Sequence, residues 1–104
     1  MRSVWYHRLV SEYADELDGN FANLIVYIGQ MAAMAFGDLA DQEGNRIEPD
    51  LGAAGAFVEM LGMLQEKTRG NLTAAEAKVL ESLLYDVRMR YVQAQGDQKR
   101  IITP

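Results

Sequence analysis

Apolar residues recur along this chain at intervals of three and four positions, the spacing that places side chains on one face of an α-helix. Near the N-terminus this pattern is made by Tyr6, Leu9, Val10, Tyr13, Ala14 and Leu17. The second apolar segment runs from about Phe21 to about Phe36 and has almost no polar side. A helix of that kind has to be covered on several sides.

Two longer helices are predicted in the second half of the chain. Asp50 is a suitable N-cap for a helix that ends at about Thr68. Glycine within a helix costs about 0.8–1 kcal/mol relative to alanine. We therefore expect Gly52, Gly55 and Gly62 to mark close packing against small residues of the second helix, either of the same chain or of a second copy. The last helix is predicted from Ala74 to about Ala94, with apolar positions at Ala77, Leu80, Leu84, Val87, Tyr91 and Ala94.

The boundary between the last two helices is the most sharply defined feature of the sequence. Gly70 suits the left-handed residue that ends many helices. Thr73 and Glu76 have the spacing of a capping box, in which each side chain accepts a hydrogen bond from the other residue's amide. Because this connection is short, we expect the two helices to pack as an antiparallel hairpin.

The sequence therefore predicts an all-α fold of four helices. Residues 1–20 form an N-terminal amphipathic helix and turn, residues 21–95 a helical core domain, and residues 96–104 a frayed C-terminal tail. The polar segment between residues 37 and 49 is expected to be a solvated loop. The sequence assigns no functional role to the N-terminal segment Trp5-Tyr6-His7.

The second helix also carries small residues at a spacing of four. Gly29, Ala33 and Gly37 lie along one side, where another helix backbone can approach closely. Leu24 and Ile28 extend this surface. Because one short chain has few helices to cover an apolar helix, we expect a dimeric helical bundle in which these five residues contribute to a homodimer interface.

Composition narrows the possible functions. The chain has 104 residues, a net charge of −5 and no cysteine, so it is the size of one domain and cannot form a disulfide. An acidic chain is poorly suited to nucleic acid, which needs a basic surface. The N-terminus has no apolar signal-like segment, and Leu24 to Phe36 is shorter than the roughly 20 residues that span a bilayer. We therefore expect a cytoplasmic protein, with membrane association unlikely.

Candidate chemistry is sparse. Lys67, Arg69, Asn71 and Thr73 bring cations and polar groups to a helix N-terminus, which favours an anion site, although capping accounts for most of them. His7 is the only histidine, and no acid, base and nucleophile set is recognisable, so we expect no enzyme, metal or cofactor.

Two further clusters contain residue types that occur in binding sites. The methionines Met31, Met34, Met60, Met63 and Met89 could line an adaptable pocket, but ordinary core packing is the simpler interpretation. Tyr85, Arg88, Arg90 and Tyr91 resemble a single-strand nucleic-acid platform in residue type alone. We interpret them as a solvated face with a core tyrosine.

From about residue 21 to residue 95 the chain resembles a bacterial domain-of-unknown-function family, number eighteen-forty-four (DUF1844). The resemblance rests on the runs Gln30-Met31-Ala32-Ala33-Met34-Ala35-Phe36-Gly37, Pro49-Asp50-Leu51, Met60-Leu61-Gly62-Met63-Leu64-Gln65-Glu66-Lys67-Thr68-Arg69-Gly70-Asn71-Leu72-Thr73 and Leu84-Tyr85-Asp86-Val87-Arg88-Met89-Arg90-Tyr91-Val92. It implies a small bacterial helical protein and no assigned reaction.

Two functions remain open from the sequence. The first is a non-catalytic, homo-oligomeric interaction or adaptor protein that acts through its helix faces and an unknown protein partner. The alternative is a small-molecule or anion binder that uses the Lys67–Thr73 junction or a Met-lined pocket.

Overall fold

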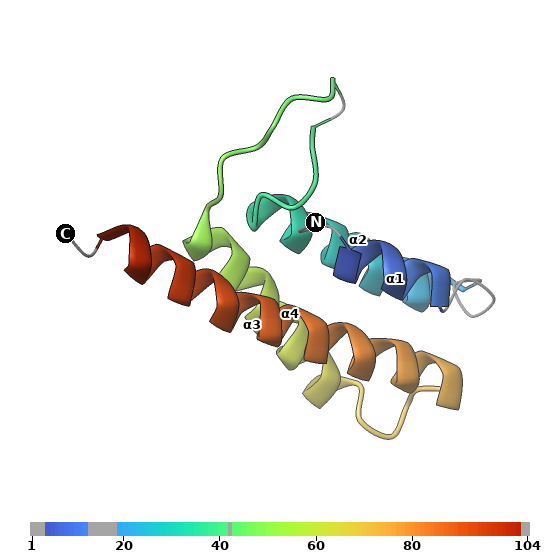
Figure 1. The fold of residues 1–104 in the computed structure, drawn as a ribbon. Helices are drawn as coiled ribbons and strands as arrows, with labels where there is room; N and C mark the ends of the chain where they lie inside the picture. Colours follow the sequence, from blue (N-terminus) through green and yellow to red (C-terminus); the bar gives the residue numbers. More distant parts are fainter. Residues whose placement is uncertain (1–3, 13–18, 42, 103–104) are drawn as a thin grey trace.

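A computed structural model describes residues 4–12, 19–41 and 43–102, with side chains up to Asp97. Over these residues the fold consists of four helices and contains no strand: α1 (Val4–Glu12), α2 (Asn20–Ala35), α3 (Leu51–Lys67) and α4 (Ala74–Ile102). The expectation of an all-α fold with four helices is thus confirmed (Figure 1).

The observed helix bounds agree with the sequence pattern except at the two ends of the chain. α2 and α3 begin and end within one residue of their predicted limits. In the N-terminal segment α1 ends at Glu12, and the predicted helical positions Tyr13, Ala14 and Leu17 lie outside the described residues. α4 continues to Ile102, where we expected a frayed tail. Gly96 is the only glycine within α4, which contains no proline, so little in this sequence opposes a continued helix.

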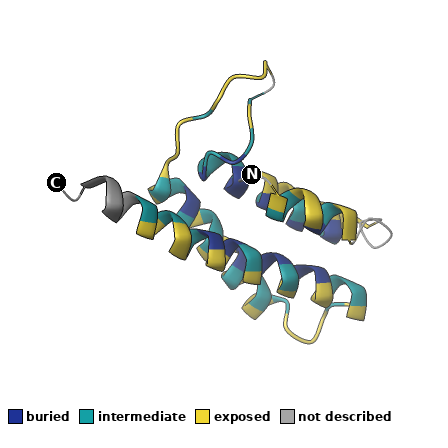
Figure 2. Cartoon of the chain, in the orientation of Figure 1, coloured by how far each residue is buried: buried dark blue, intermediate teal, exposed yellow. Residues whose placement is uncertain are grey.

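The helices form two layers. α1 and α4 lie nearer the viewer than α2 and α3, and the molecule is only 18 Å thick along its shortest axis (Figure 1). Helices with their side chains are about 10–12 Å across, so this thickness corresponds to two layers. The core lies between them, where the buried sides of the helices meet (Figure 2). Its fully buried apolar side chains include Ile25, Phe36, Leu61, Leu80, Leu83, Leu84 and Val87.

Gly55 and Gly62 of α3 pack against α4, and this corrects our expectation that they meet the small residues of α2 in the same chain. A Cβ at Gly55 would lie 3.2 Å from the ring and hydroxyl of Tyr91, and one at Gly62 would lie 3.3 Å from Arg88 Nη2. Two large α4 side chains therefore occupy the space that these glycines leave. Gly52 has no comparable neighbour. A Cβ there would meet only the carboxylate of Asp50, the N-cap of the same helix, at 3.5 Å.

The connection between α2 and α3 is long, projects from the helices and is fixed at its base (Figure 1). Gly37 has φ +80°, a conformation that favours glycine. The amide of Asp50 donates to the carbonyl of Ala35 over 2.7 Å, which joins the end of α2 to the start of α3. Near the tip, the carboxylate of Asp41 accepts from the amides of Glu43 and Asn45, forming a local turn.

A buried ion pair joins the start of this connection to α4. Asp38 Oδ2 accepts from Arg90 Nε over 2.7 Å, and Asp38 Oδ1 accepts from Arg90 Nη2 over 2.9 Å. The side chain of Asp38 has no exposed surface, and that of Arg90 is 7% exposed. Such a two-bond arrangement between guanidinium and carboxylate is both strong and directional.

Trp5 of α1 completes the same cluster. Its indole Nε1 donates to Asp38 Oδ2 over 2.9 Å. The Trp5 ring also packs edge-on against the ring of Phe36. The Arg90 guanidinium lies 5.1 Å from the centre of that same Phe36 ring. We call Trp5, Phe36, Asp38 and Arg90 the Asp38 cluster. It joins α1, the end of α2, the connection and α4.

The Asp38 cluster corrects our interpretation of Arg90 as part of a solvated face. The side chain is buried because it follows Leu83 and Val87 on the core side of α4. Tyr85 and Arg88 are exposed, as expected, and Tyr91 is half-buried.

Replacing Arg90 with methionine should leave the Asp38 carboxylate buried without its cation. Removing one partner of a buried pair costs about 3–5 kcal/mol, whereas the same substitution at exposed Arg88 should change stability by about 0.5 kcal/mol or less. Adding Asp38→Asn to Arg90→Met should recover part of the loss, because no buried charge remains. Urea unfolding followed by the fluorescence of Trp5, the single tryptophan, measures all three. Equal stabilities for Arg90→Met and Arg88→Met would contradict this account.

Candidate functional site

The junction between α3 and α4 has the predicted capping geometry. Thr73 Oγ1 accepts from the amide of Glu76 over 3.1 Å, and Glu76 Oε1 accepts from the amide of Thr73 over 2.9 Å. Gly70 has φ +84°, as its predicted role requires. The last turn of α3 is closed by Thr68, whose hydroxyl donates to the carbonyl of Leu64. The predicted helix boundary and capping box are therefore confirmed.

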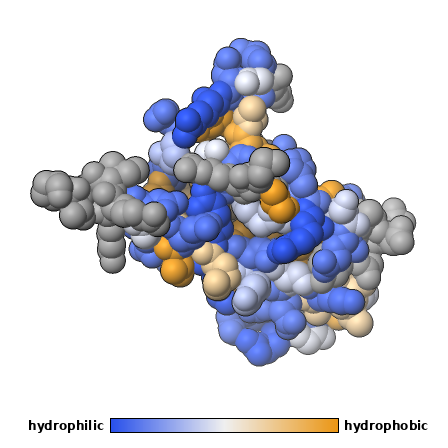
Figure 3. All heavy atoms as spheres, viewed as in Figure 1, coloured by the Kyte–Doolittle hydropathy of each residue, from blue (hydrophilic) through white to orange (hydrophobic). Residues whose placement is uncertain are grey.

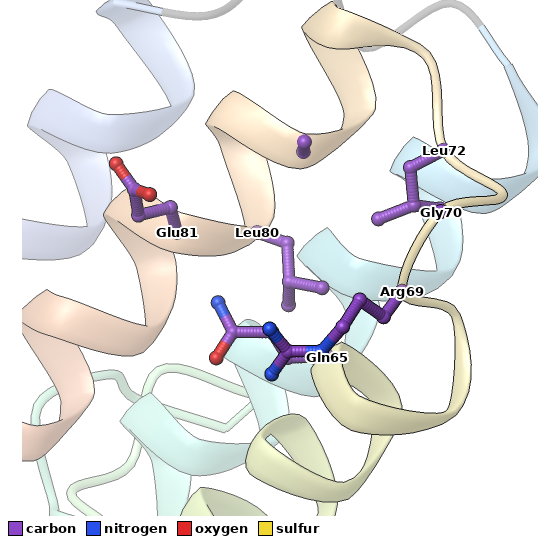
Figure 4. Close-up of a pocket in the computed structure, with 7 residues that line it drawn as sticks. Gln65, Arg69, Gly70, Leu72, Leu80 and Glu81 are labelled. Carbon is purple, nitrogen blue, oxygen red and sulfur yellow. The ribbon is translucent and has the colours of Figure 1, made fainter.

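A shallow open pocket of about 330 Å³ lies beside this junction (Figure 4). Arg69 and Gln65 line one part of it, and Leu80 and Glu81 of α4 line another. The pocket is completed by Gly70, Leu72 and Ala77. It therefore contains one cation and one carboxylate, a mixed electrostatic environment.

The four residues of the predicted anion site do not line this pocket together. Arg69 contributes to it, but Lys67, Asn71 and Thr73 are not among its lining residues. Arg69 Nη2 also donates to Glu66 Oε2 over 2.6 Å, so its charge is partly compensated. The Thr73 amide is already bonded to the Glu76 carboxylate. A carboxylate of the protein itself thus holds a position where an anion would bind at this helix N-terminus.

The small residues of α2 face the interior of the same chain. A Cβ at Gly29 would lie 3.0 Å from a methyl group of Leu83 on α4, and Ala33 is fully buried. At Gly37 the close neighbours are Pro49 and the carbonyl of Ile47. The close approach that this spacing permits is therefore made within one chain. Of the five predicted interface residues, Leu24 is exposed, and Ile28 and Gly37 are half-buried.

A different side of α2 is both apolar and exposed. Tyr27 is 60% exposed and Leu24 is 46% exposed, and Ile28 and Met31 beside them are half-buried. On α3, Met60 and Met63 are exposed to a similar degree. We call these six residues the α2–α3 apolar face.

Helix geometry places the two halves of this face on one surface. Gly29 marks the side of α2 that meets α4, and Tyr27 and Met31, two residues away in either direction, lie about 200° around the helix. By the same argument Gly62 marks the side of α3 that meets α4; Met60 lies about 200° from it and Met63 about 100° from it, on the exposed outer side of α3. Because α2, α3 and α4 pack against one another in pairs, the sides of α2 and α3 that turn away from α4 share one outer surface.

The opposite surface of the molecule has a different character. The view with α1 and α4 in front is mostly hydrophilic, with scattered apolar side chains (Figure 3). α4 contributes exposed Tyr85, Met89 and Val92 on its outer side.

The methionine cluster considered from the sequence is spread over three helices. Three of its members are exposed, Met60, Met63 and Met89, and two are half-buried, Met31 and Met34. These five methionines therefore lie at or near the surface of three helices, and this corrects our interpretation of them as ordinary core residues.

An open groove of about 620 Å³ separates α1 from α4 and is lined mainly by charged residues. Arg8 lies 3.5 Å from the Asp86 carboxylate across it. Burial raises the pKa of Asp86; Arg8 lowers it and Glu12 raises it further. Glu81, Ser82, Tyr85 and Leu9 complete the lining. Within the part of the chain that the structure describes, no three His, Cys, Asp or Glu side chains are placed to hold a metal ion.

These observations describe a small helical protein with a closed core and an uncovered apolar face. None of its described helices has both the length and the apolar composition that a membrane span requires. The chain belongs to the family described as domain of unknown function (DUF1844), whose sequence model matches residues 18–93. The family resemblance is thereby confirmed. No curated protein matches the chain, and no solved structure matches it.

Gly37→Ala should destabilise the protein more than Gly70→Ala. Both residues have a positive φ, which costs a residue with a Cβ about 1–2 kcal/mol. A Cβ at Gly37 would also lie 3.0 Å from Pro49 and 3.2 Å from the Ile47 carbonyl, whereas one at Gly70 meets nothing within 4 Å. Urea unfolding of the two variants measures the difference. Equal losses would show that the base of the connection adapts to the extra methyl group.

Proposed function

We propose that this protein is a non-catalytic interaction module that self-associates, and that the α2–α3 apolar face is the surface through which it does so. The observation that carries the proposal is a group of four exposed large apolar side chains on neighbouring helices α2 and α3, at Leu24, Tyr27, Met60 and Met63. Contiguous apolar patches of more than a few hundred Å² on soluble proteins commonly mark interaction sites.

The two-layer shape supports the same proposal. Its radius of gyration is 14.2 Å, against about 13 Å for an ordinary domain of this size. A thin molecule covers less of its apolar surface with its own chain. A second copy related by a two-fold axis covers the same face on both molecules, which is the commonest form of oligomer. The homodimer is therefore the assembly that we propose.

The proposed arrangement of α3 and α4 is an antiparallel hairpin. It is supported by their short connection and by the order of their contacts, since Gly55 lies against Tyr91 and Gly62 against Arg88. A rigid helix pair of this kind presents its outer residues at fixed spacing to another protein. We place this module in the bacterial cytoplasm, in line with the family resemblance and the absence of cysteine from the sequence.

Substituting Tyr27 with glutamate should dissociate the homodimer, whereas Tyr85→Glu should not. The two tyrosines are a matched pair because they are 60% and 65% exposed, on α2 and α4 respectively. Light scattering after size exclusion at micromolar concentration measures the mass of each variant, and far-UV circular dichroism checks the fold. A monomeric wild type at these concentrations would contradict the proposal. Ala33→Glu is unsuitable for this test because Ala33 is buried inside the chain.

An alternative function is binding of a small anion at the Lys67–Thr73 junction. It is favoured by the pocket of about 330 Å³ to which Arg69 contributes. In this alternative Arg69 and Lys67 supply charge, and Asn71 and Thr73 supply polar groups at the start of α4.

Inorganic phosphate distinguishes the two functions. If the junction binds it, millimolar phosphate should raise the melting temperature, because a ligand that binds only the folded state stabilises it by mass action. Lys67→Ala combined with Arg69→Ala should abolish that increase. Chloride in place of phosphate, at equal ionic strength, is the control for general salt effects. An identical shift in the wild type and the double variant would exclude the junction as the site.

A further inference from the structure

We infer that the centre of self-association is α3, which pairs antiparallel with α3 of a second copy about a two-fold axis at Met63. In this arrangement Glu59 of each copy lies opposite Lys67 of the other. The inference rests on the proposed self-association and adds to it a register and two intermolecular ion pairs.

The sequence of α3 is self-complementary about Met63. In an antiparallel pair with two-fold symmetry, residues equally far before and after the axis face each other. Glu59 lies four residues before Met63 and Lys67 four residues after it. Positions four apart lie on the same side of a helix, so all three side chains belong to one side of α3. An acid therefore meets a base at both ends of the contact.

The three side chains are available for this contact. Glu59 and Lys67 are exposed, and Met63 is 49% exposed. Neither charge has a hydrogen bond or ion pair with another described residue. Glu66 differs in this respect because its carboxylate is paired with Arg69. The helix thus keeps one acid and one base without partners, one turn on either side of an exposed methionine.

The surroundings of this axis suit a helix–helix contact. Met60 adjoins Met63, and the small side chain of Ala56 lies on the same exposed side, where it permits close approach. Leu24 and Tyr27 of α2 extend the apolar surface beyond α3. Apolar residues at the centre with charges toward the edge are the usual composition of a protein interface. The flexible methionine side chains can adjust to one another across the axis.

This charge pattern specifically favours a second copy as the occupant. A different protein would have to supply a base and an acid in the reverse order at the same spacing. The chain itself supplies them as soon as it is rotated by the two-fold axis. The membrane is a poorer occupant because the acidic chain, with a net charge of −5, is repelled by anionic lipid.

A charge exchange tests the register. Each dimer contains the Glu59–Lys67 contact twice, so Glu59→Lys or Lys67→Glu alone creates two repulsive pairs and should raise the dimer dissociation constant about tenfold or more. The double variant Glu59→Lys/Lys67→Glu restores two attractive pairs, and its dissociation constant should return to within about threefold of the wild type. Sedimentation equilibrium at about 50 mM salt measures the constants, because higher salt screens these contacts.

Matched controls come from the exposed connection between α2 and α3. Glu48→Lys and Arg46→Glu change the net charge as the two single variants do, at exposed positions away from α3. They should leave the dissociation constant within about twofold of the wild type. Circular dichroism of all variants confirms that the helices are intact.

The possible outcomes separate the two proposals. Weakening by each single variant with recovery in the double variant supports the pairing at Met63. A wild-type dimer that no Glu59 or Lys67 variant weakens overturns this pairing and leaves self-association through another surface. Weakening without recovery in the double variant overturns the register. A monomeric wild type overturns both the pairing and the proposed function.

Discussion

The bidentate ion pair between Asp38 and Arg90 is the interaction on which the rest of the fold depends. It joins Asp38, three residues after the end of α2, to Arg90 near the centre of α4, 52 positions further along the chain. Burying two charges is costly unless their hydrogen-bonding capacity is satisfied, and Trp5 of α1 supplies a third hydrogen bond to the Asp38 carboxylate. No buried side-chain nitrogen or oxygen of the described residues lacks a partner. A single carboxylate therefore sets the positions of two helices and of the connection.

The helices of this protein are predictable from sequence because their boundaries are determined by neighbouring residues. Asp50 caps α3 through the amide of Ala53, and Thr73 and Glu76 cap α4. The Asp38 cluster was not predicted, because its members are far apart in the chain and Asp38 follows a helix in a polar segment. One indication was available: Arg90 occupies a core position after Leu83 and Val87. A charged residue at such a position requires a buried partner of opposite charge.

The small-residue side of α2, which we expected to contact a second copy, faces the interior of the same chain. Gly29 and Ala33 suggested a close helix contact, and that contact exists, but α4 of the same chain makes it through Leu83. Sequence spacing shows which residues share a side of a helix and does not show which neighbour covers that side. Once α4 occupies the small-residue side, the larger apolar residues Leu24 and Tyr27 remain uncovered. The exposure of Leu24 and Tyr27 is thus a consequence of how the core is filled.

The hydrogen bond from the Asp50 amide to the Ala35 carbonyl has a further consequence for how this fold can vary. It closes the connection at its base, so the helices are positioned without help from the exposed tip around Glu43 and Gly44. Lengthening a flexible loop whose ends are already held raises the entropic cost of closing that loop by only about 0.6 kcal/mol for each doubling of its length. The tip is therefore a permissive position for inserting a peptide tag, or even a whole folded domain, while the four-helix body stays intact.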